Sequence, residues 1–363
     1  MSCVVRTTDK IKNAVAVVSK SPFLLPFVSR SMPISTRITR LFGIKHPIIQ
    51  GGMHHVGFAE LAAAVSNAGG LGTVTALSQP GPDELRAEIR KTRSLLVDPS
   101  TPIAVNLTLL PMLAPPNYSA YGDVVVEEGI TVVETAGHFN GLAPFVEQFK
   151  AAGIKVIHKC VQVRHAQSAA RLGVDAISMD GFDCAGHPGE MDVGNWVLLA
   201  KAGRELDIPF VASGGCATGS QLAAALALGA EGMNMGTRFM ATREAPIQDG
   251  IKRALAEGTE HDTTLVMRSF KNTERVYKNE TAARVQALEA EFPGEFEKIA
   301  DLVRGDNYKK AFLETGNTED SIWSCGPVMG LFDAPDQTCE QVISEIMAEA
   351  EDIISNRLPK VIQ

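Results

Sequence analysis

The stretch that decides the fold of this chain is Met179-Asp180-Gly181-Phe182-Asp183-Cys184-Ala185-Gly186-His187-Pro188-Gly189. It has the pattern of a buried strand that ends in a loop of small residues carrying a histidine. Glycine lets a backbone approach a ligand closely because it has no Cβ, and a histidine can move protons near neutral pH. Two later stretches, Phe210–Gly215 and Gly232–Arg238, repeat the plan of a strand ending in Gly, Ser or Thr. Together they predict a site for a phosphate-bearing cofactor.

The composition is that of an ordinary soluble globular protein, with 45% hydrophobic and 21% charged residues among 363. A net charge of −8 and a pI near 5.6 argue against partners such as nucleic acid or acidic membranes. No apolar run approaches the roughly 20 residues that span a bilayer. The six cysteines show no CxxC spacing, so the sequence predicts neither a disulfide framework nor a metal site, and favours a reducing compartment.

Residues 1–36 differ in composition from the rest of the chain. Up to Arg40 the sequence is rich in Lys, Arg, Ser and Thr and contains a single acidic residue, Asp9. That composition suits a mitochondrial transit peptide. A disordered or weakly docked basic extension explains it as well, and Met32 offers an alternative start. We therefore expect a cytoplasmic or a mitochondrial protein.

From Pro47 onward, short apolar runs alternate with longer amphipathic ones, which predicts a parallel sheet covered on both faces. Eight such units match an α/β fold of the (β/α)8 TIM-barrel type over residues 37–250. A doubly wound sheet would need fewer strands and a Gly-rich turn after the first one, which Gln50–Met53 does not supply. The predicted strands are Pro47–Gln50, Leu71–Thr75, Ile103–Leu107, Thr131–Thr135, Lys155–Cys160, Ala176–Asp180, Phe210–Ser213 and Gly232–Gly236.

The pattern changes after the barrel. Residues 251–321 are charged and helical in pattern without a convincing strand, and we interpret them as a helical insert or lid over the barrel. Residues 322–363 contain a helical segment, Glu340–Arg357, that is expected to return to the barrel.

Polar or glycine residues end every predicted strand. The active site of a barrel lies at the carboxyl ends of its strands, and the loops after strands seven and eight commonly hold phosphate. Ser213-Gly214-Gly215 and Gly236-Thr237 occupy those two positions, and one phosphate held mainly by backbone suggests a mononucleotide such as FMN. The remaining strand-end candidates are Gly51-Gly52-Met53, Thr75, Asn106, Glu134-Thr135, Lys159 and Asp180-Gly181.

Lys159 and Asn106 are candidates for contact with a flavin ring. A buried lysine would stabilise negative charge on a reduced ring or a substrate oxyanion. It would serve equally as the partner of a carboxylate such as Asp180 or Glu134, and both roles are compatible. The amide of Asn106 can donate to and accept from a pyrimidine edge, or it can cap the following loop.

His187 is the candidate for proton chemistry, because its position between Gly186 and Pro188 restricts its backbone. The alternative is a histidine on a surface loop. His54, His55 and His138 also follow strand ends and are expected near the pocket. His158 is expected to be a hydrogen-bonded histidine of the barrel wall.

At these residues the chain resembles the nitronate monooxygenase family, formerly called 2-nitropropane dioxygenases, which are FMN-dependent TIM barrels. The resemblance runs from about Arg37 to Arg357. It rests on Pro47–Met53, Ala68–Gly72, Asn106-Leu107-Thr108, His158-Lys159-Cys160, Gly186-His187, Ala212–Gly215 and Asn234–Phe239.

The resemblance implies a set of contacts and an activity. It makes His187 the catalytic base and Lys159 its partner in catalysis, in an oxidation of nitronates or nitroalkanes by O2 to carbonyl compounds and nitrite. The residues it implies in FMN binding are Gly51, Gly52, Met53, Asn106, Lys159, Asp180, Ala185, Ser213, Gly215, Gly236 and Thr237.

The loop Cys184–Gly189 lacks the second glycine that many nitronate oxidisers have before the histidine. Together with Thr108-Leu109-Leu110-Pro111 and Ile322-Trp323-Ser324-Cys325-Gly326, it resembles a branch of NADH:quinone reductases. The alternative function is therefore an NAD(P)H:quinone reductase, with NAD(P)H as co-substrate of the same FMN barrel. Reduction of enoyl thioesters and flavin binding without catalysis are the remaining alternatives. The expected partners are a small nitronate or quinone, O2 and a second copy of the chain in a homodimer.

Overall fold

The computed structural model describes residues 33–109, 115–137, 141–332 and 336–362. The predicted leader lies outside these ranges except for its last residues, where Thr36 caps the first helix, and the mitochondrial alternative stays a prediction. His138 also lies outside the described residues.

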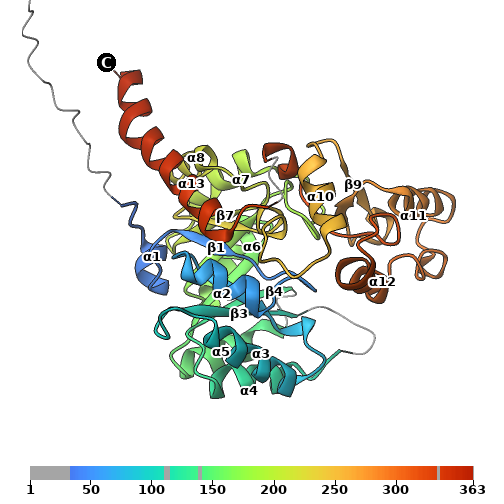
Figure 1. Cartoon of the computed structure of the whole chain (residues 1–363), viewed down its shortest axis with the longest axis horizontal. Coiled ribbons are helices and arrows are strands. Elements are labelled where there is room, and N and C mark those ends of the chain that lie inside the picture. The colour runs from blue at the N-terminus through green and yellow to red at the C-terminus, as the bar shows by residue number, and fades with distance from the viewer. Residues whose placement is uncertain (1–32, 110–114, 138–140, 333–335, 363) are drawn as a thin grey trace, which may run out of the picture. The chain divides into compact units, whose positions relative to one another are not determined.

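Eight parallel strands form one sheet in the order β1-β8-β7-β6-β5-β4-β3-β2 (Figure 1). A parallel bridge between Ile49 and Leu71 joins β1 to the start of β2, which closes the sheet into a barrel and confirms the predicted fold. The strands are β1 (Ile48–Gln50), β2 (Gly72–Thr75), β3 (Ile103–Leu109), β4 (Val132–Gly137), β5 (Lys155–Cys160), β6 (Ala176–Asp180), β7 (Phe210–Ser213) and β8 (Met233–Met235).

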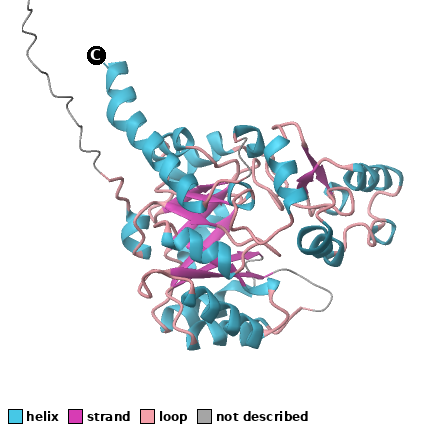
Figure 2. Cartoon of the chain, in the orientation of Figure 1, coloured by secondary structure: helices cyan, strands magenta, loops and turns pink. Residues whose placement is uncertain are grey.

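A helix follows most of these strands, so that helices surround the strands in Figure 2. The main hydrophobic core lies between the outer face of the sheet and these helices. The helices of the barrel are α2 (Ala59–Asn67), α3 (Pro82–Ser94), α4 (Tyr118–Glu127), α5 (Leu142–Ala151), α6 (Val163–Leu172), α7 (Asn195–Glu205), α8 (Gly219–Ala227) and the short α9 (Thr237–Met240).

The amino-terminal end of the barrel interior is apolar. Helix α1 (Arg37–Phe42) packs Ile38 and Phe42 against this layer, which seals that end. Polar chemistry is thereby left to the opposite end of the strands. The residues of the layer are Ile49, Leu71, Ala104, Val132, Ile157, Ala176 and Val211.

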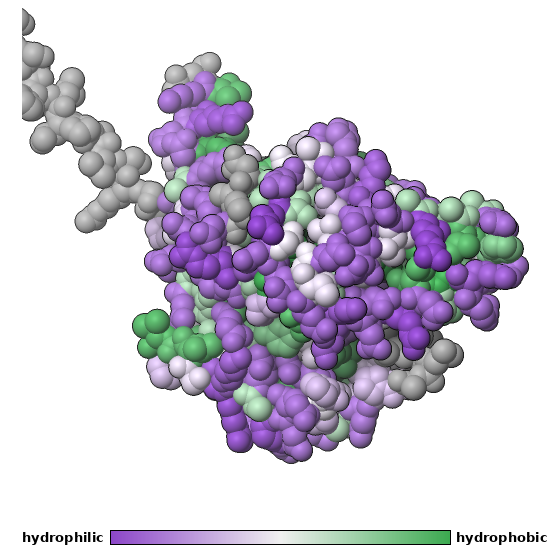
Figure 3. All heavy atoms as spheres, turned by 45° about the vertical axis from the view of Figure 1, so that its right-hand side comes forward, coloured by the Kyte–Doolittle hydropathy of each residue, from purple (hydrophilic) through white to green (hydrophobic). Residues whose placement is uncertain are grey.

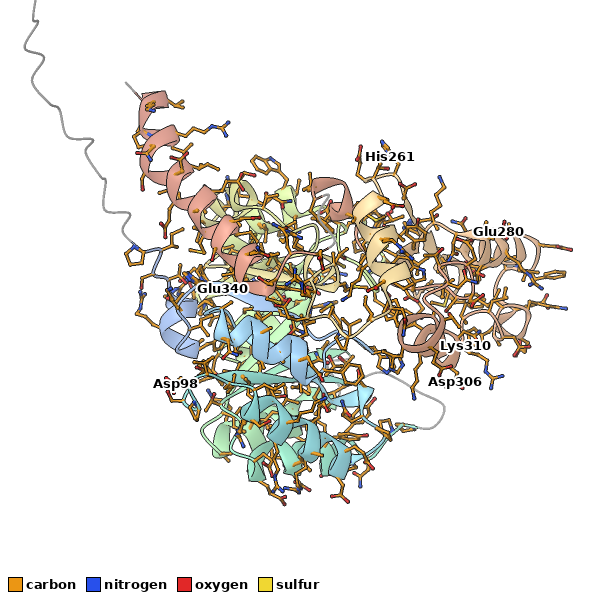
Figure 4. The ribbon with its side chains drawn as sticks, in the orientation of Figure 1. Asp98, His261, Glu280, Asp306, Lys310 and Glu340 are labelled. Atoms are coloured by element: carbon orange, nitrogen blue, oxygen red, sulfur yellow. The ribbon has the colours of Figure 1, made fainter. Side chains whose placement is uncertain are left out.

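The segment after the barrel is not wholly helical, contrary to the prediction. Strands β9 (Thr263–Val266) and β10 (Glu274–Tyr277) form an antiparallel pair between α10 (Asp249–Glu257) and α11 (Glu280–Glu291). Each strand is only four residues long, and Glu274 and Arg275 of β10 are charged, so neither shows the apolar run that marks the barrel strands. The helices of this insert, with α12 (Gly305–Lys310), lie to one side of the barrel strands, where Figure 4 labels Glu280, Asp306 and Lys310.

Helix α13 (Cys339–Asp352) returns to the barrel, where the backbone N–H of Gly219 in α8 donates to Glu349 at 2.7 Å. Gly219 is required there because a Cβ would overlap the backbone of Ile346. The face in Figure 3 is mainly hydrophilic, with hydrophobic residues in separate patches. Among the described residues, no helix has both the length and the apolar composition needed to cross a membrane.

Candidate active site

A polar layer lies directly above the apolar end of the barrel. Every second residue of a strand faces the barrel interior. On five strands, the next inward-facing residue after the one in the apolar layer is polar. Register places Asn106 opposite Glu134 and Lys159 opposite Ser178 on neighbouring strands. The steps are Ala104 to Asn106, Val132 to Glu134, Ile157 to Lys159, Ala176 to Ser178 and Val211 to Ser213.

Glu134 organises this layer. Its carboxylate is 1% exposed and accepts hydrogen bonds from Gly52 N at 2.8 Å, Asn106 Nδ2 at 2.8 Å and Asn234 Nδ2 at 2.7 Å. A buried carboxylate of this kind is satisfied by three donors from three different strand ends. It therefore holds the loop after β1 against β3 and β8.

Lys159 lies between two carboxylates, with Nζ 3.6 Å from Glu134 and 3.5 Å from Asp180. Burial alone would lower the pKa of Lys159, but the charges of Asp180 and Glu134 outweigh it and raise that pKa above its ordinary value. The side chain is therefore a fixed cation inside the barrel. The predicted ion pair with a neighbouring carboxylate is confirmed, and it involves both candidates.

Two glycine-containing loops border the cavity at the strand ends. Gly214 and Gly215 have φ values of 87° and 67°, a backbone conformation that favours glycine. Side-chain amides of Asn195 and Gln221 donate to the carbonyls of Gly214 and Gly215 and so hold the loop after β7 in place. On the far side, Gly52 approaches Asn106 so closely that a Cβ would overlap the asparagine side chain.

These elements border a cavity of about 100 Å³ that opens to solvent. Lys159 and the loops after β1, β6, β7 and β8 all contribute to its lining, as expected for the carboxyl face of a barrel. Asn106 does not line it directly but supports Gly52 from behind. The predicted residues in the lining are Gly51, Gly52, Met53, Lys159, Asp180, Ala185, Ser213, Gly215, Gly236 and Thr237.

His187 follows two residues after Ala185, a lining residue, in the loop after β6. Its side chain is exposed and does not contribute to the lining of this cavity. Its loop is attached to the insert, since Gly186 pairs with Arg275 of β10, and Thr273 N donates to Glu190 at 2.8 Å. The position of His187 is therefore set jointly by the barrel and the insert.

His54 and His55 stack on each other with ring centroids 3.8 Å apart, and neither lines the cavity. Burial is the main reason that the pKa of His55 falls to about 3, with His54 and Lys309 contributing in the same direction. Tyr308 of the insert lies 6.2 Å from the His55 ring. His158, as predicted, is a buried histidine of the barrel wall, 2.8 Å from the hydroxyl of Thr135.

Sequence reasoning missed six lining residues, Cys184, Cys216, Asn234, Met235, Gly326 and Val328. Asn234 was detectable from alternation, since it is the single inward position of β8. Gly326 was not, because it comes from the C-terminal segment, where its N–H donates to Thr237 Oγ1 at 2.9 Å. The five described cysteines are all free thiols, and the described ranges contain no cluster of His, Cys, Asp and Glu suited to a metal ion.

Comparison with known proteins agrees with this geometry. A family model described as nitronate monooxygenase matches residues 35–349. A relative from Rhodococcus jostii strain RHA1, named (3aS,4S,5R,7aS)-5-hydroxy-7a-methyl-1-oxo-octahydro-1H-indene-4-carboxyl-CoA dehydrogenase, is 32% identical over 87% of this chain and 96% of its own length. A nitronate monooxygenase from Paraburkholderia phytofirmans is 33% identical over 62% of this chain and 71% of its own length.

Solved structures show the same barrel. FabK from Thermotoga maritima is similar with a TM-score of 0.82 and 31% identity over 90% of this chain and 99% of that one. A nitroalkane oxidase from Streptomyces ansochromogenes gives a TM-score of 0.74 over 88% of this chain and 99% of that one. Its 24% identity supports the fold alone.

Proposed function

This chain belongs to the nitronate monooxygenase family, and from that premise we propose that it is an FMN-dependent oxidoreductase that oxidises alkyl nitronates or nitroalkanes with O2 to carbonyl compounds and nitrite. The observation that carries the proposal is the cavity at the strand ends. It combines a permanent cation, Lys159, with the loops after β7 and β8, which contain Gly214-Gly215 and Gly236.

The residues of the cavity fit FMN. Ser213, Gly215, Gly236 and Thr237 would hold the phosphate, since backbone N–H groups in these two loops suit an anion. Gly51-Gly52-Met53 leaves room for a flat ring, with Lys159, Asp180 and Ala185 also in the lining and Asn106 behind Gly52. FMN would supply the electron-transfer chemistry that these side chains lack.

Two side chains of the protein would assist the reaction, one by stabilising charge and the other by transferring a proton. Lys159 would stabilise negative charge that develops near the ring. His187 would take a proton from the carbon beside the nitro group, or orient a nitronate already formed. We expect His187→Ala to retain FMN and to slow nitronate oxidation by about 100-fold or more. An unchanged rate would remove His187 from the mechanism.

A reductase is the second candidate, and the exposure of His187 outside the cavity favours it, because a reductase does not need a base there. NAD(P)H would then deliver a hydride, and a quinone or an enoyl thioester would accept the electrons. The relative from Rhodococcus jostii, which matches more of this chain than the Paraburkholderia enzyme does, is a dehydrogenase of a CoA thioester by name.

One experiment separates the two candidates. The purified chain, loaded with FMN, is mixed anaerobically with propionate 3-nitronate or with NADH while flavin absorbance is recorded. Bleaching by the nitronate with release of nitrite on admitting air supports the oxidase. Bleaching by NADH alone rejects the oxidase in favour of the reductase, and a chain that binds no flavin overturns both.

A further inference from the structure

A groove runs between α7 and α8 on the outside of the barrel, next to the cavity just described. At the closed end the two helices meet at Gly203, where a Cβ would overlap the carbonyl of Leu228. Towards their amino-terminal ends they leave a groove of about 460 Å³ that is open to solvent. The groove therefore opens on the same face of the barrel as the cavity, because both helices begin just after the strand-end loops.

The groove and the cavity share a wall. Gly214, Gly215, Cys216 and Val328 line both of them. Asn195 and Gln221, which hold this loop by its carbonyls, are themselves lining residues of the groove. A ligand in the groove would thus lie against the outer side of the loop that we assign to phosphate.

The chemistry of the groove differs from that of the cavity. Its walls are largely apolar, and the indole of Trp196 at the start of α7 is 72% exposed beside Leu199. Leu331, across the groove, is 53% exposed. Large apolar side chains left open at the edge of a concave site are typical of ligand sites rather than of a solvated helix pair.

Two carboxylates flank these apolar walls. Asp183 lies at the start of α7, where it accepts a hydrogen bond from Asn195 N at 2.8 Å. Glu260 comes from the loop before β9, next to His261, which Figure 4 labels at the edge of the molecule beyond α10. Carboxylates can accept hydrogen bonds from ribose hydroxyls, and they disfavour an additional phosphate on the sugar.

We propose that the α7–α8 groove binds the adenosine diphosphate group of a dinucleotide. The base would pack between Trp196 and the apolar walls, the ribose hydroxyls would face Asp183 and Glu260, and the pyrophosphate would lie at the mouth beside Gly214 and Gly215. This proposal rests on the proposed function in one respect, the assignment of the loop Gly214-Gly215 to the flavin phosphate. Two dinucleotides, FAD and NADH, contain this group. In FAD it is attached to the flavin through the flavin phosphate, whereas NADH would be a separate co-substrate.

Trp196 provides the measurement, because the only other tryptophan, Trp323, is fully buried. We expect ADP to quench the fluorescence of the FMN-loaded full chain in a saturable way. Trp196→Ala should weaken ADP binding, followed by calorimetry, by about tenfold through loss of base stacking. Val197→Ala, at the next and equally exposed position of α7, is the matched control and should bind ADP normally. An ADP molecule with a phosphate on its 2′-hydroxyl should bind more weakly than ADP.

Two further arms identify the carrier. If FAD is the source, the flavin-free chain binds FAD more tightly than FMN, and Trp196→Ala removes only that difference. If NADH is the source, ADP competes with NADH on the FMN-loaded chain. Absence of saturable ADP binding, or binding that Trp196→Ala leaves unchanged, overturns the proposal. Flavin absorbance of the same sample reports separately on the cavity, so a failure of the proposed function is recognised independently.

Discussion

Gly186 and Arg275 exchange two backbone hydrogen bonds, from Gly186 N to Arg275 O at 3.1 Å and from Arg275 N to Gly186 O at 2.6 Å. The guanidinium of Arg275 also donates to the carbonyl of Phe182 at 2.9 Å and lies 4.9 Å from the centre of its ring. The insert thus holds the loop of His187 along one side. The pairing attaches the insert to the loop after β6, which also carries the lining residues Cys184 and Ala185.

Replacing Arg275 should loosen this loop without disturbing the flavin site. Arg275→Ala keeps the backbone pair but loses the side-chain bonds to Phe182 and Thr263. We expect FMN retention to be unchanged and nitronate turnover to fall about tenfold, since small displacements of a reacting group are costly. Steady-state kinetics measure the effect, and exposed Arg284 in α11, changed to Ala, is the control. Equal activity of the two variants would show that the clamp has no part in turnover.

Removing the charge of Lys159 should affect both folding and flavin binding. Lys159→Met leaves the buried carboxylates of Glu134 and Asp180 facing each other without a cation. We expect the free energy of unfolding to fall by about 3 kcal/mol, as for other broken buried pairs, and FMN to bind more weakly. Urea unfolding and flavin titration measure the two effects. Lys155→Met, on the same strand, should change neither, and a Lys159 variant of normal stability would contradict the buried ion pair.

The barrel was predictable because its strands are buried on both faces and are therefore mostly apolar up to the polar residues near their carboxyl ends. Lys155–Cys160 and Ala176–Asp180 have the same bounds in the prediction and in the structure. The polar residues near their carboxyl ends, Lys159 and Asp180, indicate the face of the active site, and ten of the eleven predicted cofactor residues line the cavity.

The sequence did not reveal β10 or the role of Glu134, because both depend in part on contacts with residues that are distant in the sequence. Strand β10 pairs with the nearby β9, but it is also bridged to Gly186 and Ser324, and no local pattern contains those two partners. Glu134 collects donors from three strands because of the register of the sheet. The sequence alone does not reveal that register, so it identifies Glu134 as a strand-end candidate and a partner of Lys159 but not as the acceptor of these three hydrogen bonds.

Close approach at Gly52 gives a test of the cavity that does not depend on catalysis. Gly52→Ala places a Cβ on the side chain of Asn106 and breaks the contact that supports the loop after β1. We expect the variant to fold and to lose most of its flavin, measured as visible absorbance per protein. Gly305→Ala, where a Cβ meets no atom within 4 Å, is the matched control. Normal flavin content in Gly52→Ala would place the cofactor elsewhere.

His158 should make the protein less stable in acid. Burial lowers the pKa of His158 from 6.5 to about 4, so between these values the unfolded chain binds a proton that the folded chain excludes. The free energy of unfolding should therefore decrease as the pH falls, by about 2 kcal/mol from this residue between roughly pH 7 and pH 5. Urea unfolding at both pH values measures the slope. His158→Asn should reduce that slope by the same amount, whereas His261→Asn, at a side chain that is 83% exposed, should keep it. An unchanged slope in His158→Asn would mean that this histidine takes up its proton within the folded barrel.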